Sequence, residues 1–249
     1  MQPAAPPMPS IADNLHRVEE SIAEACRQAG RPRQEVALMA VSKTHPVEYL
    51  LEAAEAGHRL FGENRVQEFA GKFPAAVTAG YTPAAENGMA IHLIGHLQAN
   101  KAARAAELFS AVDTVDATRL AERLNDACAR LGRTLPVLLE IKLSEEPSKQ
   151  GLVPESAELA ALLERLPDLA QLAPQGLMTV APLDPDPATA RTCFRTLRRL
   201  REQFARRYPR LALDQLSMGM SGDSAVAIEE GSTQVRIGTA IFGARPRPA

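Results

Sequence analysis

A lysine stands at the end of an apolar run in the stretch "ALMAVSKTHP", residues 37–46. A lysine at the end of a strand ordinarily extends its aliphatic stem into water. Burial, in contrast, lowers the pKa of a lysine amine and makes its neutral form available for attack on a carbonyl group. If the strand end faces a cavity, Lys43 is therefore a candidate for Schiff-base chemistry.

An arginine lies inside a second apolar run, "TQVRIGTAIFG", residues 233–243. Arg236 stands two residues before Gly238, so we expect it to face the interior of the fold rather than solvent. A buried arginine is costly unless it is paired. The sequence therefore predicts a ligand or a carboxylate as the partner of Arg236.

Two loops rich in small residues, "SMGMSGDS" (217–224) and "RIGTA" (236–240), could bind a phosphate group. They allow close approach of the backbone and supply the hydroxyl groups of Ser217, Ser221 and Thr239. In (β/α)₈ barrels the loops after the last two strands often bind phosphate, although plain turns are the alternative. With Lys43 on the aldehyde and Arg236 near the pyridine nitrogen, the set fits a pyridoxal phosphate site.

The elements that must position these residues alternate along the chain. Several of the short apolar runs are almost continuously apolar, which is typical of parallel strands covered on both faces, and helix-like segments lie between the runs. Eight such units predict a single (β/α)₈ barrel, with a doubly wound open sheet as the alternative. The expected strands lie near residues 35–43, 58–64, 90–97, 110–116, 135–143, 173–181, 213–220 and 233–243.

The apolar period before the first expected strand predicts an additional N-terminal helix. It would be capped by Ser10 and would end near Gly30 and Pro32, and its apolar residues are Ile11, Leu15, Val18, Ile22 and Cys26. Residues 1–9 are rich in proline, and we expect a disordered tail there, followed by one barrel domain over residues 10–249. Segments 77–90 and 182–188 are predicted loops.

The composition restricts the partners. The chain has 28 Lys plus Arg and 30 Asp plus Glu, a net charge of −2, so we expect neither nucleic acid nor an anionic membrane as a partner. Cys26, Cys128 and Cys193 are far apart in helix-like stretches and are expected to be buried thiols. We find no secretory signal and no apolar stretch of membrane-spanning length, which favours a cytoplasmic location.

Other polar residues have simpler interpretations. His45, His92 and His96 lack the spacing of a metal site and are expected at the surface or the rim. Lys101 and Lys149 could receive or transfer an aldehyde, but exposed loop lysines are favoured. The arginines between residues 191 and 207 are expected on a solvated helix face.

Seven strings carry a family resemblance: "AVSKTHP", "FGENRVQE", "HLIGHLQANK", "SKQGL", "GLMTV", "LSMGMSGD" and "GSTQVRIGTAIFGAR". They are similar to the pyridoxal phosphate homeostasis proteins, a family that resembles the barrel domain of alanine racemase, over residues 11 to 245. The resemblance implies a (β/α)₈ barrel with pyridoxal 5′-phosphate on Lys43 and with Arg236 facing the ring nitrogen. It also implies that the cofactor site contains Asn64, Ser217, Ser221, Gly238 and Thr239.

The resemblance further implies a role in the intracellular homeostasis of the cofactor and of amino and keto acids. Alanine racemases use a second proton-transfer group from an additional β domain of a partner subunit, whereas this chain ends soon after the eighth run. We therefore expect a monomer without rapid turnover, which binds the cofactor, contacts amino acids and transfers the cofactor to apoenzymes. A weak amino-acid racemase and a Schiff-base aldolase are the alternatives, and the aldolase would need a carboxylate beside Lys43.

Overall fold

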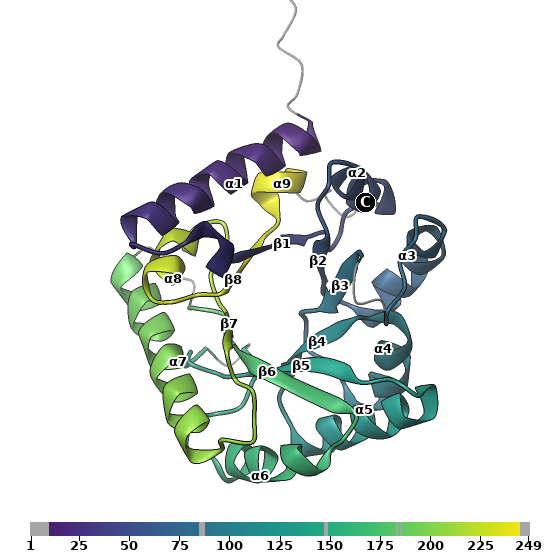
Figure 1. Ribbon diagram of the computed structural model, residues 1–249, viewed down its shortest axis with the longest axis vertical. Helices are drawn as coiled ribbons and strands as arrows, with labels where there is room; N and C mark the ends of the chain where they lie inside the picture. The colour runs from purple at the N-terminus through teal and green to yellow at the C-terminus, as the bar shows by residue number, and fades with distance from the viewer. Residues whose placement is uncertain (1–9, 85–87, 147–148, 183, 185, 245–249) are drawn as a thin grey trace, which may run out of the picture.

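The strands of this protein close into a parallel barrel (Figure 1). The computed structural model describes residues 10–84, 88–146, 149–182, 184 and 186–244. Strands pair in chain order and β1 pairs with β8, so the barrel is complete and the prediction of a (β/α)₈ barrel is confirmed over that of an open sheet. The eight strands are β1 (Ala37–Val41), β2 (Leu60–Glu63), β3 (Ala90–Leu93), β4 (Ala111–Val115), β5 (Leu135–Glu140), β6 (Leu172–Met178), β7 (Gln215–Ser217) and β8 (Gln234–Ile237).

Helices surround the barrel and connect its strands (Figure 1). They are α1 (Ile11–Gln28), α2 (Val47–Glu55), α3 (Val66–Thr78), α4 (Ala102–Leu108), α5 (Thr118–Leu131), α6 (Ala157–Arg165), α7 (Pro187–Arg207), α8 (Ser224–Glu229) and α9 (Thr239–Phe242). Three short 3₁₀ turns lie at Arg33–Glu35, Ala99–Lys101 and Leu166–Asp168. No helix in the described part of the chain has the length and apolar character needed to cross a membrane.

The predicted N-terminal helix is α1, and it begins as the sequence indicates. Ser10 accepts a hydrogen bond from the backbone N–H of Asp13, while the Asp13 carboxylate accepts one from the backbone N–H of Ser10. This reciprocal capping satisfies two donors that the first helical turn leaves open. The helix then packs against α8 and α9, next to β8 and β1 (Figure 1). The predicted tail, residues 1–9, lies outside the described residues.

Three predicted segments differ in the structure. The eighth run does not continue as a strand to residue 243, because β8 ends at Ile237 and the short helix α9 follows Gly238. The predicted loop 182–188 already contains the start of α7, since Asp186 caps the backbone N–H of Ala188 and Pro187 occupies the first turn. Proline is well suited to that position because it has no N–H to satisfy. Similarly, α3 extends to Thr78, within the segment predicted as a loop.

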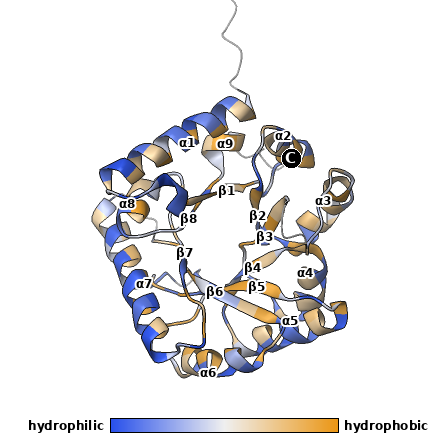
Figure 2. Cartoon of the chain, in the orientation of Figure 1, coloured by the Kyte–Doolittle hydropathy of each residue, from blue (hydrophilic) through white to orange (hydrophobic). Residues whose placement is uncertain are grey.

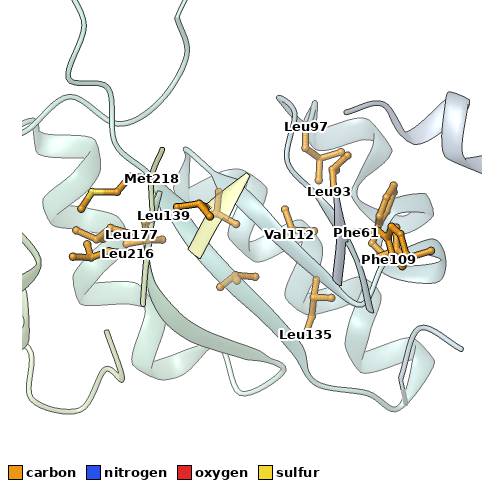
Figure 3. Close-up of a cluster of buried hydrophobic side chains, with 14 of the residues drawn as sticks. Phe61, Leu93, Leu97, Phe109, Val112, Leu135, Leu139, Leu177, Leu216 and Met218 are labelled. Carbon is orange, nitrogen blue, oxygen red and sulfur yellow. The ribbon is translucent and has the colours of Figure 1, made fainter. Parts of the chain in front are cut away.

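The apolar core lies between the barrel and its helices. Leu139, Leu177 and Leu216 are buried on the outer face of neighbouring strands (Figure 3), and the strands and the inner helix faces are the more hydrophobic parts of the chain (Figure 2). The three cysteines are buried and unpaired in α1, α5 and α7, as predicted. The inner face of the barrel is different, because several of its buried side chains are polar or charged.

Candidate functional site

Lys43 lies at the C-terminal mouth of the barrel, two residues after β1 ends. The residues of β1 alternate between the two faces of the sheet: Met39 faces inward, where its sulfur would be 2.8 Å from a Cβ atom on Gly62. Lys43 lies two residues beyond β1, in a turn, and is half-buried, whereas Ser42 faces the helices. In barrels of this class the chemistry occurs at this end of the strands.

A buried network holds the residue before Lys43 on the outer side of the barrel. Ser42 Oγ donates to Glu63 Oε1 over 2.8 Å, and the Lys72 ammonium donates to the same oxygen over 2.8 Å and to the Ser42 carbonyl over 3.1 Å. Glu63 is fully buried, and burial raises its pKa while Lys72 opposes that shift. The network therefore anchors the end of β1 to α3.

A second contact holds the residue that follows Lys43. The backbone N–H of Thr44 donates to Glu68 Oε1 at 2.5 Å, and Lys72 donates to that oxygen at 3.0 Å. Thr44 has a φ of +66°, a left-handed conformation that is unfavourable for a β-branched residue. Glu68 and Lys72 therefore fix both neighbours of Lys43 and limit the positions open to its amine.

Arg236 occupies the barrel interior on the strand next to β1. It is paired in register with Met39, and its guanidinium donates from Nη1 to Ser217 Oγ and from Nη2 to the Thr179 carbonyl, both at 2.7 Å. The residue is 5% exposed, which confirms its expected burial. Burial lowers the pKa of the guanidinium, and the carboxylates of Asp113, Glu140 and Asp223 oppose that shift.

The direct partners of Arg236 are neutral, which the sequence did not predict. We expected a carboxylate or a ligand as its partner. Among the described residues its hydrogen-bond partners are a hydroxyl and a carbonyl oxygen, and the carboxylates act electrostatically, so the carboxylate half of the expectation was wrong and the ligand half stays a prediction. The cation is thus oriented from β6 and β7 and keeps the planar geometry that suits hydrogen bonding to a ring nitrogen.

The two predicted phosphate loops lie at the same mouth as Lys43. Ser221 and Thr239 are exposed, and Thr239 begins the four-residue helix α9, in which the backbone N–H groups of Ile241 and Phe242 both donate to the Gly238 carbonyl. A Cβ atom on Gly238 would be 3.1 Å from the Val41 carbonyl, so the loop after β8 lies against the end of β1. Ser217 is different, because it is fully buried and bonded to Arg236 inside the barrel.

Asn64 borders a small cavity of about 190 Å³ at this mouth. The cavity wall also contains His96, Glu140 and Lys149. Asn64 fits closely against Gly95, where a Cβ atom would be 2.1 Å from the Asn64 carbonyl oxygen. A glycine at position 95 is therefore required for Asn64 to approach the mouth.

Glu140 is a carboxyl group that sequence reasoning missed. It ends β5, and its Oε2 atom is buried without a hydrogen-bond partner among the described residues. Burial raises the pKa of Glu140 to about 7; Asp116 contributes, and Arg236 and Lys149 oppose the shift. Lys149 is half-buried, and its ammonium lies 3.4 Å from the Ala181 carbonyl, so it is less exposed than expected.

The three histidines have structural partners. His45 is 5% exposed and stacks on Tyr49, so the expectation of a surface or rim position was wrong for this residue. His92 borders the N-terminal mouth of the barrel, with a side chain 15% exposed and bonded to Asp113, and His96 lies at the C-terminal rim. Within the described ranges, no three His, Cys, Asp or Glu residues are arranged to hold a metal ion.

Comparison with known proteins identifies the family. The family model described as alanine racemase, N-terminal domain, matches residues 14–246. The pyridoxal phosphate homeostasis protein of Vibrio cholerae is 44% identical over 96% of this chain and 98% of its own length. The protein of that name from Escherichia coli is 42% identical over 96% of this chain and 98% of its own length. This chain belongs to the pyridoxal phosphate homeostasis protein family.

Solved structures agree with this family assignment. PipY of Synechococcus elongatus without pyridoxal phosphate has a TM-score of 0.82, with 39% identity over 94% of this chain and 100% of its own. The structure of PipY with pyridoxal phosphate bound has a TM-score of 0.80 at 38% identity. An alanine racemase from Clostridium difficile has a TM-score of 0.68 at 13% identity and shares the fold alone. The family's barrel thus includes a structure that holds the cofactor.

Proposed function

We propose that this protein binds pyridoxal 5′-phosphate at the C-terminal mouth of its barrel and serves the homeostasis of the cofactor and of amino and keto acids. The observation that carries the proposal is the adjacency of β1 and β8. Lys43 follows β1, and Arg236 and Thr239 lie on and after the neighbouring strand β8, which supports one shared site at this mouth. The relatives named for this role and the solved PipY complex support it.

The residues at this mouth fit the cofactor. Lys43 would hold its aldehyde as a Schiff base, and Ser221, Gly238 and Thr239 would bind the phosphate through hydroxyl and backbone N–H groups. Arg236 would face the ring nitrogen, supported by Ser217, and Asn64 would lie beside the ring. When bound, the cofactor supplies an electrophilic aldehyde and a ring that can accept electrons.

The buried arginine bears on the chemistry that we expect. A fixed cation at the ring nitrogen disfavours protonation there, which weakens the ring as an electron acceptor. We therefore propose that the protein holds the cofactor and transfers it to apoenzymes, and that it performs no rapid reaction on the cofactor. A weak amino-acid racemase is the alternative, and Glu140, with its raised pKa, is a carboxyl group at the mouth that could move a proton.

The first test is an absorbance titration with pyridoxal phosphate, before and after borohydride reduction. We expect a Schiff-base band that reduction traps in the wild type and that Lys43→Ala lacks. Lys149→Ala and Lys101→Ala are matched controls and should retain it. Equal bands in the wild type and Lys43→Ala would overturn the proposed anchor. Steady-state turnover of amino acids by the loaded protein then separates a carrier from a racemase.

A further inference from the structure

A chain of hydrogen bonds crosses the barrel interior below Arg236. Asp113, on β4, is 1% exposed; its Oδ1 atom lies 3.0 Å from His92 Nδ1, and its Oδ2 atom accepts from Gln234 Nε2 at 3.1 Å. Gln234 Nε2 also donates to Ser217 Oγ at 2.9 Å. Ser217 Oγ in turn accepts from Arg236 Nη1 at 2.7 Å.

The partners in this hydrogen-bond network allow only one orientation of the Gln234 side-chain amide. The opposite amide orientation would place the Gln234 carbonyl oxygen against the Asp113 carboxylate, so the NH₂ group must face Asp113. Its two hydrogens are then used by Asp113 and Ser217, and Ser217 becomes an acceptor for both Gln234 and Arg236. Loss of Gln234 would therefore leave Ser217 without one of the two donors that orient it.

The end of the hydrogen-bond network that is farthest from Arg236 lies at the opposite, N-terminal mouth of the barrel. His92 borders a cavity of about 880 Å³, whose wall contains Ala37, Leu60 and Ala90, the first residues of β1, β2 and β3. The side chain of His92 is 15% exposed, whereas Gln234 and Arg236 are 4% and 5% exposed. The hydrogen-bond network thus connects solvent at the N-terminal mouth with the Arg236 guanidinium near the C-terminal mouth.

We infer that Asp113 and Gln234 are positioning residues for Arg236, and that His92 anchors them from the N-terminal mouth. The inference rests on the proposed function, since its effect is measured on the bound cofactor. Buried hydrogen-bond networks stabilise one arrangement when every member has a partner. His92 lies at the end of the barrel opposite Lys43. A substitution of His92 therefore changes the orientation of the Arg236 guanidinium relative to the cofactor ring.

The test compares two glutamines in the same cavity wall. Gln234→Met removes both donors and keeps the length of the side chain. Gln215→Met is the matched control, because Gln215 Nε2 donates to Gln175 Oε1 at 3.1 Å and is not bonded to Asp113, Ser217 or Arg236. We expect Gln234→Met to weaken pyridoxal phosphate binding about ten-fold and to shift the absorbance maximum of the bound cofactor, with no effect of Gln215→Met.

A second variant tests the anchor and does not depend on the folding of Gln234→Met. His92→Leu should weaken binding in the same direction, by about three-fold. A purely structural role would lower the melting temperature of the apoprotein and leave the absorbance maximum unchanged. Wild-type affinity and spectrum in folded Gln234→Met or in His92→Leu would overturn the inference. The absence of a Lys43-dependent band in the wild type would instead overturn the proposed function.

Discussion

Thr44 and Glu68 are joined by a hydrogen bond of 2.5 Å from a backbone N–H to a carboxylate, although they are 24 positions apart in the sequence. The bond fixes the residue directly after Lys43 in the left-handed conformation. Lys72 holds Glu68 and also the carbonyl of Ser42, directly before Lys43. The position of Lys43 is therefore set by a helix of the outer ring.

We predict that Glu68→Ala weakens the covalent capture of pyridoxal phosphate. Without the acceptor, Thr44 can leave its unfavourable conformation, which costs on the order of 1 kcal/mol in the native fold. The expected effect is a loss of about three- to ten-fold in the rate of band formation at Lys43, measured by stopped-flow absorbance. Glu68→Gln keeps an acceptor oxygen and should remain near the wild-type rate. Equal rates for all three proteins would show that the bond does not position Lys43.

We predict that Lys72→Met is strongly destabilising at pH 8. It leaves the fully buried Glu63 carboxylate without its cation, and removal of one partner of a buried ion pair costs about 3–5 kcal/mol. Urea unfolding of the apoprotein measures the loss. Because burial raises the pKa of Glu63, the carboxyl group can take up a proton at lower pH, so the loss should be smaller at pH 5.

The double variant Glu63→Gln/Lys72→Met is the control for this explanation. It removes the buried charge together with its partner and should recover part of the lost stability at pH 8. A double variant no more stable than Lys72→Met would mean that the cost arises from lost packing of the lysine stem.

We predict that Glu140 makes the apoprotein less stable as the pH rises from 4.5 to 7. In this range the unfolded chain releases the proton while the folded protein, with a pKa of about 7, retains it. The folded state then binds more protons, so the free energy of unfolding falls with pH. Glu140→Gln should remove this slope and gain on the order of 2–3 kcal/mol relative to the wild type between pH 5 and pH 8.

Glu145→Gln is the matched control for Glu140, because Glu145 is exposed on the loop that follows β5. It should leave the pH dependence of urea unfolding unchanged. If Glu140→Gln and the wild type have parallel stability profiles, then the carboxyl group titrates alike in the folded and unfolded states.

We predict that Arg236→Lys weakens pyridoxal phosphate binding about ten-fold and destabilises the fold little. An ammonium group keeps the positive charge near Asp113 and Glu140 but cannot donate in a planar fork to both Ser217 Oγ and the Thr179 carbonyl. Equilibrium titration by absorbance measures the affinity, and the melting temperature of the apoprotein reports the fold. Wild-type affinity in Arg236→Lys would show that charge alone accounts for the role of this residue.

The sequence by itself determined the order of elements and the mouth at which the chemistry lies. Continuous apolar runs are required wherever a strand is covered on both faces, so the eight strands were visible without a structure. Residues such as Lys43 and Ser221 lie in the loops that follow strand ends, and a parallel barrel brings all those ends to one side. Ser10 likewise marked the start of α1 by a local rule.

Only the tertiary structure decided which polar residues contact one another. Glu63 and Asn64 are neighbours at the end of β2, yet one bonds to Lys72 outside the barrel and the other borders the mouth. Asp113, Gln234 and Arg236 form one interior chain from β4 and β8, and Glu140 is buried near them. The register between strands sets these contacts, and periodicity within one strand contains no information about its partner's register.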